Sequence, residues 1–128
     1  MIQISGELRV SNDAFDDPAE IRRRMDAEGY LFFKGLQDKD KLMSLRKDML
    51  TVMMEGGWLV AGTDPVDGIA DITKQCTEGD VEYTDVYRHV QAVESFHRSG
   101  HWPEVVSMIE KIVDGPVLPH PQKITRLW

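Results

Sequence analysis

The chain has 128 residues, 41% of them hydrophobic, and a formal net charge of −7 from 22 acidic and 15 basic side chains. This length is sufficient for one domain, and the composition is that of a globular protein. Because both signs of charge are interspersed along the chain, no basic stripe is available for a phosphate backbone. We therefore expect neither nucleic acid nor an anionic membrane as a partner.

Cysteine usage and the amino terminus predict a reducing, cytoplasmic location. Cys76 is the single cysteine, so no internal disulfide can form. Residues 1–7 lack the basic start and the long apolar run of a signal peptide. No apolar run of the sequence is long enough to cross a bilayer.

Two short strands are predicted in the first third of the chain. Apolar and polar residues alternate between Ile2 and Val10, which is the period of a strand. The aromatic run Tyr30–Phe33 lies between Gly29 and Gly35. A short aromatic run with glycine on both sides favours a buried strand over a helix.

Four helices are predicted from capping residues and from apolar residues spaced by three and four. The first follows Asp17, a capping carboxylate before a proline, and ends at Gly29. The second follows Asp38 and ends at residues 56–57. The last two are expected over residues 81–97 and 102–113.

The remaining segments are a long loop and a terminal strand. Residues 56–80 show no sustained period, which is typical of a binding loop or a lid, and residues 58–60 can pin one end of it in the core. Three prolines within residues 116–121 exclude a helix there. A strand is predicted over residues 123–128, and because it ends without a turn, we expect the fold to continue beyond residue 128.

The histidines invite a metal-site interpretation. His97 and His101 are four residues apart, the spacing that places two imidazoles on one face of a helix. Residues 99–100 interrupt that helix, however, and we interpret the pair as histidines at a helix end. His89 is expected to be in solvent, and His120, although held between two prolines, has no partner in the sequence.

The long loop carries acidic residues and the cysteine. The acidic spacing does not match the twelve-residue calcium loop, so a solvated loop is predicted over a calcium site. Cys76 has no neighbouring histidine and is interpreted as a plain thiol. The acidic residues concerned are Asp64, Asp67, Asp71, Glu78 and Asp80.

The predicted terminal strand places Lys123 and Arg126 on opposite faces, so one cation must point inward. A buried guanidinium needs an anion. That anion is either a carboxylate of the protein or a carboxylate of a ligand, and the sequence leaves both alternatives open.

Four stretches occur in a recognisable order: GYLFFKGL at 29–36, GWLVAGTDP at 57–65, EGD at 78–80 and PVLPHPQKITRLW at 116–128. They resemble the amino-terminal half of the phytanoyl-CoA dioxygenase family, over most of the chain from Ala19 onward. The first stretch is generic, whereas the loop and the final stretch are more specific.

This resemblance implies the amino-terminal portion of a non-haem oxygenase that uses Fe(II) and 2-oxoglutarate to hydroxylate a carbon. The implied fold class is α+β, a helix-rich portion of a double-stranded β-helix (a cupin-like jelly roll) with an incomplete barrel. We expect residues 1–128 to form one partial domain without an internal boundary. The family holds iron through a His-any-Asp pair and a distant histidine, and His-any-Asp is absent from this sequence. No residue is assigned to iron or to catalysis, and we expect the chain alone to be inactive and to bind neither cofactor tightly.

The resemblance assigns three residues to cosubstrate or substrate binding: Arg126 first, then Gln122 and Lys123. It also places the loop of residues 58–80 over the mouth of the pocket that receives a small-molecule substrate. The expected partner is a barrel half, on the same or a separate polypeptide, or a second copy joined through the terminal strand. The alternative function is a non-catalytic helical interaction module that pairs through this strand edge.

Overall fold

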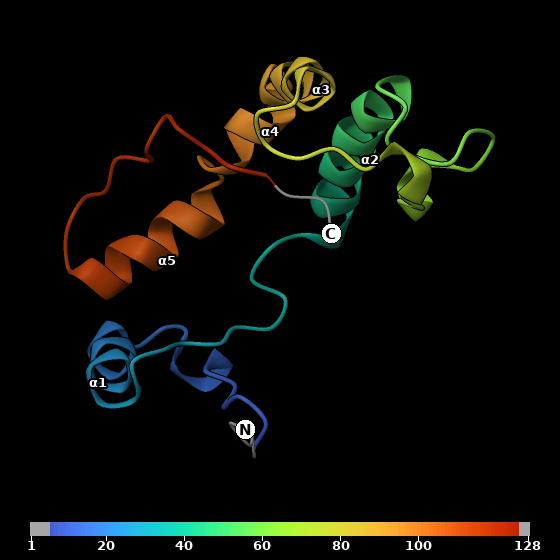
Figure 1. Ribbon diagram of the computed structural model, residues 1–128. Coiled ribbons are helices and arrows are strands. Elements are labelled where there is room, and N and C mark those ends of the chain that lie inside the picture. The colour runs from blue at the N-terminus through green and yellow to red at the C-terminus, as the bar shows by residue number, and fades with distance from the viewer. Residues whose placement is uncertain (1–5, 126–128) are drawn as a thin grey trace. The chain divides into compact units, whose positions relative to one another are not determined.

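The computed structural model describes residues 6–125, and within these residues the chain forms helices and loops with no strand or sheet (Figure 1). The fold is therefore all-helical, and the predicted α+β portion of a jelly roll is wrong. The α-helices are α1 (Pro18–Glu28), α2 (Lys39–Glu55), α3 (Val81–Gln91), α4 (Glu94–Ser99) and α5 (Pro103–Val113). Three short 3-10 helices are η1 (Asn12–Ala14), η2 (Pro65–Asp67) and η3 (Ile72–Lys74).

The first two predicted strands meet only at a single bridge and do not extend into a sheet. Phe32 makes one isolated parallel bridge to Val10, while Phe33 packs against the helical core and meets the Phe15 ring edge-on, with centroids 6.2 Å apart. At the other end of the chain, residues 123–125 form no strand either. The rest of the two predicted terminal strands, residues 1–5 and 126–128, lies outside the described residues.

The continuous helix predicted over residues 81–97 is also wrong, because the chain breaks between α3 and α4. Val93, with φ −66° and ψ 113°, is extended and precedes α4. The imidazole Nε2 of His97 lies 2.6 Å from the carbonyl oxygen of Gln91. In a continuous helix that oxygen would accept from the amide four residues later, so the histidine takes the place of a helical partner.

The two predicted helix starts in the first half are confirmed. The carboxylate of Asp17 accepts a hydrogen bond from the amide of Glu20 at 3.0 Å, and that of Asp38 accepts from the amide of Lys41 at 2.9 Å. Gly29 ends α1 in a left-handed conformation with φ 75°, which glycine adopts without a steric penalty.

The described residues cluster into two compact units. Unit 1 comprises residues 6–37 and 103–119, and unit 2 comprises residues 38–102 and 120–125. The expectation of a single domain stays a prediction.

Unit 1 is built on the packing of α1 against α5. Its buried apolar residues are Ala14, Ile21 and Met108, and Ile21 is fully buried. Lys111 of α5 ties down the turn before α1, because its Nζ donates to the carbonyl of Phe15 at 2.8 Å and lies 4.4 Å from the centre of that ring.

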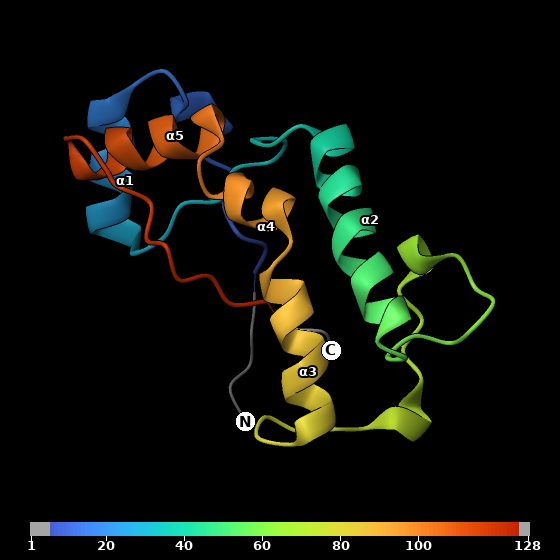
Figure 2. The same cartoon turned by 90° about the horizontal axis from the view of Figure 1, so that it is seen from above.

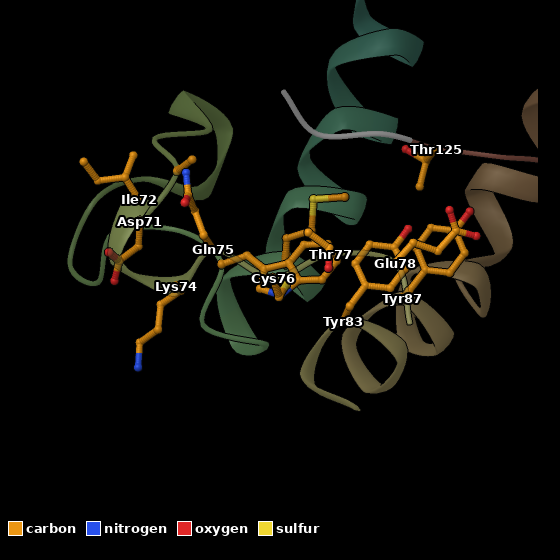
Figure 3. A pocket seen from close by; sticks show the side chains of 13 residues that line it. Asp71, Ile72, Lys74, Gln75, Cys76, Thr77, Glu78, Tyr83, Tyr87 and Thr125 are labelled. Atoms are coloured by element: carbon orange, nitrogen blue, oxygen red, sulfur yellow. The ribbon is translucent and has the colours of Figure 1, made fainter. Parts of the chain in front are cut away.

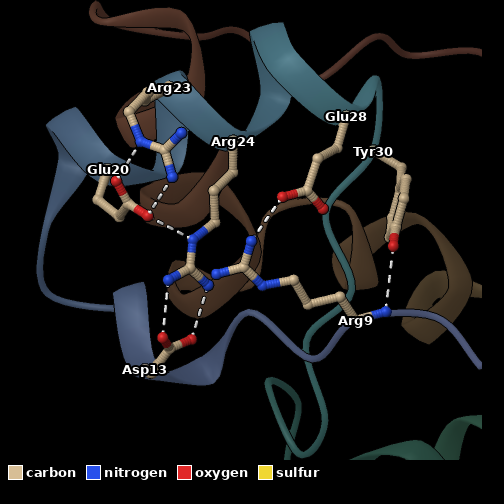
Figure 4. A network of polar contacts seen from close by, with 7 residues as sticks. All are labelled: Arg9, Asp13, Glu20, Arg23, Arg24, Glu28 and Tyr30. Carbon is tan, nitrogen blue, oxygen red and sulfur yellow. Dashed lines mark hydrogen bonds and ion pairs between the residues drawn. The ribbon is translucent and has the colours of Figure 1, made fainter.

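A polar network complements this small core (Figure 4). The guanidinium of Arg24 is only 6% exposed. It donates two parallel hydrogen bonds to the carboxylate of Asp13, each 2.7 Å, and a third of 2.7 Å to Glu20. Arg23 also donates to Glu20, at 2.6 and 2.8 Å. A buried guanidinium is tolerated only when its donors are paired in this way.

The network lowers the pKa of both carboxylates. The hydrogen bonds from Arg24 lower the pKa of Asp13 to about 2, and those from Arg23 and Arg24 lower the pKa of Glu20 to about 2. The pKa of Arg24 is raised in return. All members of the network are thus charged near neutral pH.

Unit 2 has an apolar core between α2 and α3. Leu50, Met53, Leu59 and Val90 are its buried residues. Close approach at the end of α2 depends on Gly56, where an added Cβ would lie 2.6 Å from both γ-carbons of Val86. Figure 2 shows the loop that joins α2 to α3 turning back beside α2, against which η2 packs, before it continues to the start of α3.

Candidate functional site

A cavity of about 670 Å³ lies in unit 2, and this volume is within the range of small-molecule sites. The long loop and α3 supply most of its lining (Figure 3). Met53 of α2 and Thr125 of the terminal stretch complete it. The cavity therefore gathers side chains from segments that are far apart in the sequence.

Three stacked aromatic rings form one wall of the cavity. The Trp58 and Tyr83 rings have centroids 5.7 Å apart and planes 27° apart, and Tyr83 stacks on Tyr87 at 5.2 Å and 16°. Tyr83 and Tyr87 are four residues apart on α3, so they share one side of the helix. Stacked pairs of this kind add about 0.5–1.5 kcal/mol beyond the burial of their area.

The turn after α2 places Trp58 in this stack. Gly57 adopts φ 76°, and the amide of Trp58 donates to the carbonyl of Met53 at 3.0 Å. The next residue, Leu59, is 2% exposed. The prediction that residues 58–60 pin one end of the loop in the core is thus confirmed for Leu59.

The far side of the loop returns to Trp58 through backbone hydrogen bonds. Leu59 and Ala70 form an antiparallel bridge, and the amide of Asp71 donates to the carbonyl of Trp58 at 2.9 Å. Arg46 of α2 supports the outer part of the loop, because its Nε donates to the carbonyl of Val66 at 2.9 Å. The loop is therefore closed on itself beside Trp58 and is held to α2 by Arg46.

Three of the loop carboxylates serve local turns. Asp64 accepts from the amide of Val66 at 3.0 Å, Asp71 accepts from the amide of Thr73 at 3.0 Å, and Asp80 accepts from the amide of Thr77 at 2.7 Å. The hydroxyl and amide of Thr73 lower the pKa of Asp71. These oxygens are engaged in helix and turn capping, which agrees with a structural role for the acidic loop.

Cys76 lines the cavity as a half-buried thiol. Burial raises its pKa, and the nearby carboxylates of Asp80 and Glu82 raise it further. The thiolate is the reactive form of cysteine, so this environment suppresses nucleophilic attack at neutral pH. That result agrees with the interpretation of Cys76 as a plain thiol.

The predicted binding residues Gln122 and Lys123 lie beside the cavity rather than in its lining. The amide of Gln122 donates to Nδ1 of His120 at 3.1 Å, and the carbonyl of Lys123 accepts from the side chain of Gln91 at 3.0 Å. Arg126, the residue that the resemblance assigns first to cosubstrate or substrate binding, lies outside the described residues. A role for any of the three in cosubstrate binding stays a prediction.

The residues present do not fit the iron site that the resemblance implies. Within residues 6–125 no three His, Cys, Asp or Glu side chains gather closely enough to hold a metal ion. His97 is engaged with the carbonyl of Gln91, and His101 lies beyond the end of α4. No step through a metal is derived for this chain.

Sequence reasoning missed Tyr83, Tyr87 and Thr125 as pocket residues. The two tyrosines fall within the helix predicted over residues 81–97, and Thr125 falls within the predicted terminal strand. One signal was available: two tyrosines at helical spacing follow a long loop that contains a tryptophan.

Comparison of the chain with protein-family models, with curated proteins and with solved structures gave no match. The resemblance to the phytanoyl-CoA dioxygenase family therefore stays a prediction. Among the helices of residues 6–125, each is too short or too polar to cross a bilayer.

Proposed function

We propose that this chain is a helical, substrate-facing part of a phytanoyl-CoA dioxygenase-like oxygenase, which holds an apolar small molecule in the cavity beside Trp58, Tyr83 and Tyr87. One observation carries the proposal. The loop stretch 57–65 and the final stretch 116–128 are the two more specific parts of the resemblance, and a residue of each lines the same cavity: Trp58 from the first and Thr125 from the second.

The lining supports an apolar ligand. Met53, Ile72 and the three stacked rings supply carbon surface, and burial of apolar area is the main source of affinity for such molecules. Charged side chains of both signs also lie along the cavity, Lys74 with Asp71 and Glu78. They favour a ligand that combines an apolar body with a polar end.

The proposal assigns no catalytic residue to this chain. In the family, Fe(II) and 2-oxoglutarate supply the oxidising chemistry, and polypeptide outside residues 6–125 would have to supply their ligands. This chain's own residues would shape the cavity and exclude water from the bound molecule. The single cysteine further supports the cytoplasm as the location, because it calls for no oxidising compartment.

Binding is tested with trans-parinaric acid, an apolar carboxylate whose fluorescence rises when it leaves water. Ile72 lines the cavity and is 79% exposed, so Ile72→Glu places a charge there with little risk to folding. Val81→Glu is the matched control, since Val81 is 71% exposed and is not part of the lining. We expect the wild-type chain and Val81→Glu to bind the probe and Ile72→Glu to bind at least tenfold more weakly. No binding, or an equal loss in both variants, contradicts the proposal.

The non-catalytic assignment has a separate test. The purified chain is supplied with Fe(II), ascorbate and 2-oxoglutarate, and succinate is followed against a metal-only control. We expect no succinate above the control. Turnover would show that the chain assembles a complete iron site, which the proposal denies.

The second candidate is a non-catalytic module that associates through its terminal stretch. The observation that favours this candidate is the exposure of Ile124. Its side chain is 64% exposed, and it follows Lys123, whose carbonyl is bonded to Gln91 of α3. An exposed apolar side chain on a stretch outside any helix can serve as a contact for a second copy of the chain. Light scattering across a concentration series tests it, with Ile124→Glu as the variant. A monomer at every concentration removes this candidate.

A further inference from the structure

The terminal strap, residues 120–125, is fastened to α3 by the side chain of Gln91. The carboxamide nitrogen of Gln91 donates to the carbonyl of Lys123 at 3.0 Å, in a partly buried position. The backbone of Gln91 is held as well, because its own carbonyl is 2.6 Å from Nε2 of His97. The donor that meets the strap thus sits at a fixed point near the end of α3.

Gln91 belongs to the same strip of α3 as the cavity rings. Tyr83, Tyr87 and Gln91 follow one another at intervals of four, which places them along one side of a helix. One turn, a rise of about 6 Å, separates Tyr87 from Gln91. The strip therefore presents two rings and then a hydrogen-bond donor.

The strap meets α3 at Gln91 and supplies Thr125 to the cavity that Tyr87 also lines. Two residues of chain span at most about 7 Å, so a strap fixed at Lys123 holds Thr125 within that distance of its attachment to α3. Thr125 and Tyr87 do line the same cavity, and Figure 3 shows Thr125 entering it from the terminal stretch. The place of Thr125 in the wall thus depends on the bond at Lys123.

Local contacts shape the strap before the point of attachment. Nδ1 of His120 accepts from the amide of Gln122 at 3.1 Å, and Pro119 and Pro121 restrict the backbone on both sides of His120. The side chain of Lys123 passes over Gly100, where an added Cβ would lie 2.7 Å from Cε of the lysine. A strap restricted in this way loses less entropy when it docks.

We infer that Gln91 is a positioning residue for the cavity: its carboxamide docks the terminal strap against α3, places Thr125 in the wall, and thereby couples strap docking to ligand binding. The coupling rests on the proposed function, since a ligand must occupy the cavity to sense the strap. Because such coupling is reciprocal, a bound ligand must also hold the strap down.

Docking is measured first without any ligand. Trypsin cleaves the bond between Lys123 and Ile124, and cleavage at this site requires the strap to leave α3. Gln91→Met and Gln91→Glu keep the length of the side chain and remove its donor. Loss of one hydrogen bond corresponds to about a fivefold change in an equilibrium, so we expect cleavage at Lys123, followed by mass spectrometry, to be about fivefold faster in both variants. Arg88→Met is the control on the same helix, since Arg88 is 77% exposed, and should not change the rate.

Coupling is measured next with trans-parinaric acid. We expect the probe to slow cleavage at Lys123 in the wild-type chain, and both Gln91 variants to bind the probe about fivefold more weakly with unchanged helix content by circular dichroism. A probe that binds equally to all variants, or that leaves the wild-type cleavage rate unchanged, overturns the coupling while leaving the proposed function intact. Unchanged cleavage in both Gln91 variants overturns the positioning role itself. Failure of the wild-type chain to bind the probe overturns the proposed function, and with it the coupling, whereas the ligand-free rates still report on the docking.

Discussion

The two units of this chain hold short helices in place by different physical means. Unit 1 surrounds the fully buried Ile21 with an ion-pair network centred on Arg24. Unit 2 relies on the apolar cluster that contains Leu50 and Val90, and it adds a stack of three aromatic rings. Both units should therefore be sensitive to the volume of their buried side chains, and unit 1 should in addition lose stability in acid.

The difference follows from the helices themselves. In α1, residues 22–24 are three consecutive arginines, and its buried residues are Ile21 and Arg24. A helix with so little apolar surface cannot be fixed by burial alone, and the buried guanidinium is stable only with its carboxylates. By contrast, α2 buries Leu50 and Met53 and approaches α3 closely through Gly56. Hydrogen-bonded ion pairs thus stabilise α1 in unit 1, whereas close apolar packing stabilises α2 and α3 in unit 2.

The largest effect is expected from the core of unit 1. Ile21→Ala removes a fully buried side chain, and such truncations cost about 2–4 kcal/mol of unfolding free energy. Amide hydrogen exchange of α1 measures the loss. Met25→Ala on the same helix is the control, because Met25 is 39% exposed. Equal effects of the two substitutions would show that Ile21 is not the apolar anchor of unit 1.

Close packing in unit 2 should give the next largest effect. Gly56→Ala forces a Cβ within 2.6 Å of the Val86 side chain, and such overpacking costs about 1–3 kcal/mol. Urea unfolding, followed by tryptophan fluorescence, measures this loss of unfolding free energy, since Trp58 and Trp102 both lie in unit 2. Gly115→Ala has open space around the new Cβ and should be close to neutral. Val86→Ala added to Gly56→Ala should recover part of the loss.

Acid should separate the two units. The pKa values of Asp13 and Glu20 are lowered from 3.8 and 4.5 to about 2 in the folded state. Their contribution to stability is therefore complete above about pH 4.5 and is lost as the pH falls toward 2. We expect the effect to be smaller than that of a core cavity, because the Asp13 side chain is 65% exposed and water screens the pair.

Nuclear magnetic resonance of backbone amides follows both units during this titration. The signals of α1 should weaken before those of α2 as the pH falls from 5 to 2.5. Arg24→Met removes the cause of the shifted pKa values, so in this variant the pH dependence of α1 should flatten. Loss of both units at one pH, or an unchanged profile in the variant, would contradict the contrast between them.

The smallest effect should be equal in the two units. Asp17 caps α1 and Asp38 caps α2, each through one backbone amide. Replacing either by alanine costs about 1 kcal/mol. Hydrogen exchange in the first turn of each helix is the measurement. A clear difference between Asp17→Ala and Asp38→Ala would mean that tertiary packing, rather than the local cap, fixes one of the starts.

Local signals in the sequence were enough to predict the helix starts. They were not enough to predict the contacts between residues that are distant in the sequence. Asp17 and Asp38 act through neighbouring amides, so their roles are visible in a short window. The run Tyr30–Phe33 has the composition of a strand, yet a strand needs a partner, and Phe33 instead joins the helical core. The break between α3 and α4 depends on His97 reaching the carbonyl of Gln91, which no periodicity reveals.

The candidate site was predictable in part. The aperiodic loop was expected to be a binding loop or a lid, and Trp58 of that loop lines the cavity, whereas Thr125 was expected only as a strand residue. The tyrosines were missed because ring stacking and apolar burial require the same spacing on a helix. Gln91 was missed because its partner, the carbonyl of Lys123, is a backbone atom that any residue could supply.

The single thiol of the chain, Cys76, allows ligands to be attached covalently inside this cavity. Because the chain has one cysteine and it belongs to the lining, a library of small disulfide-bearing fragments could be equilibrated with the protein at alkaline pH, where the thiolate forms. Intact mass would reveal which fragments are retained, and their common scaffold would describe the molecule that the cavity accommodates before any substrate is known.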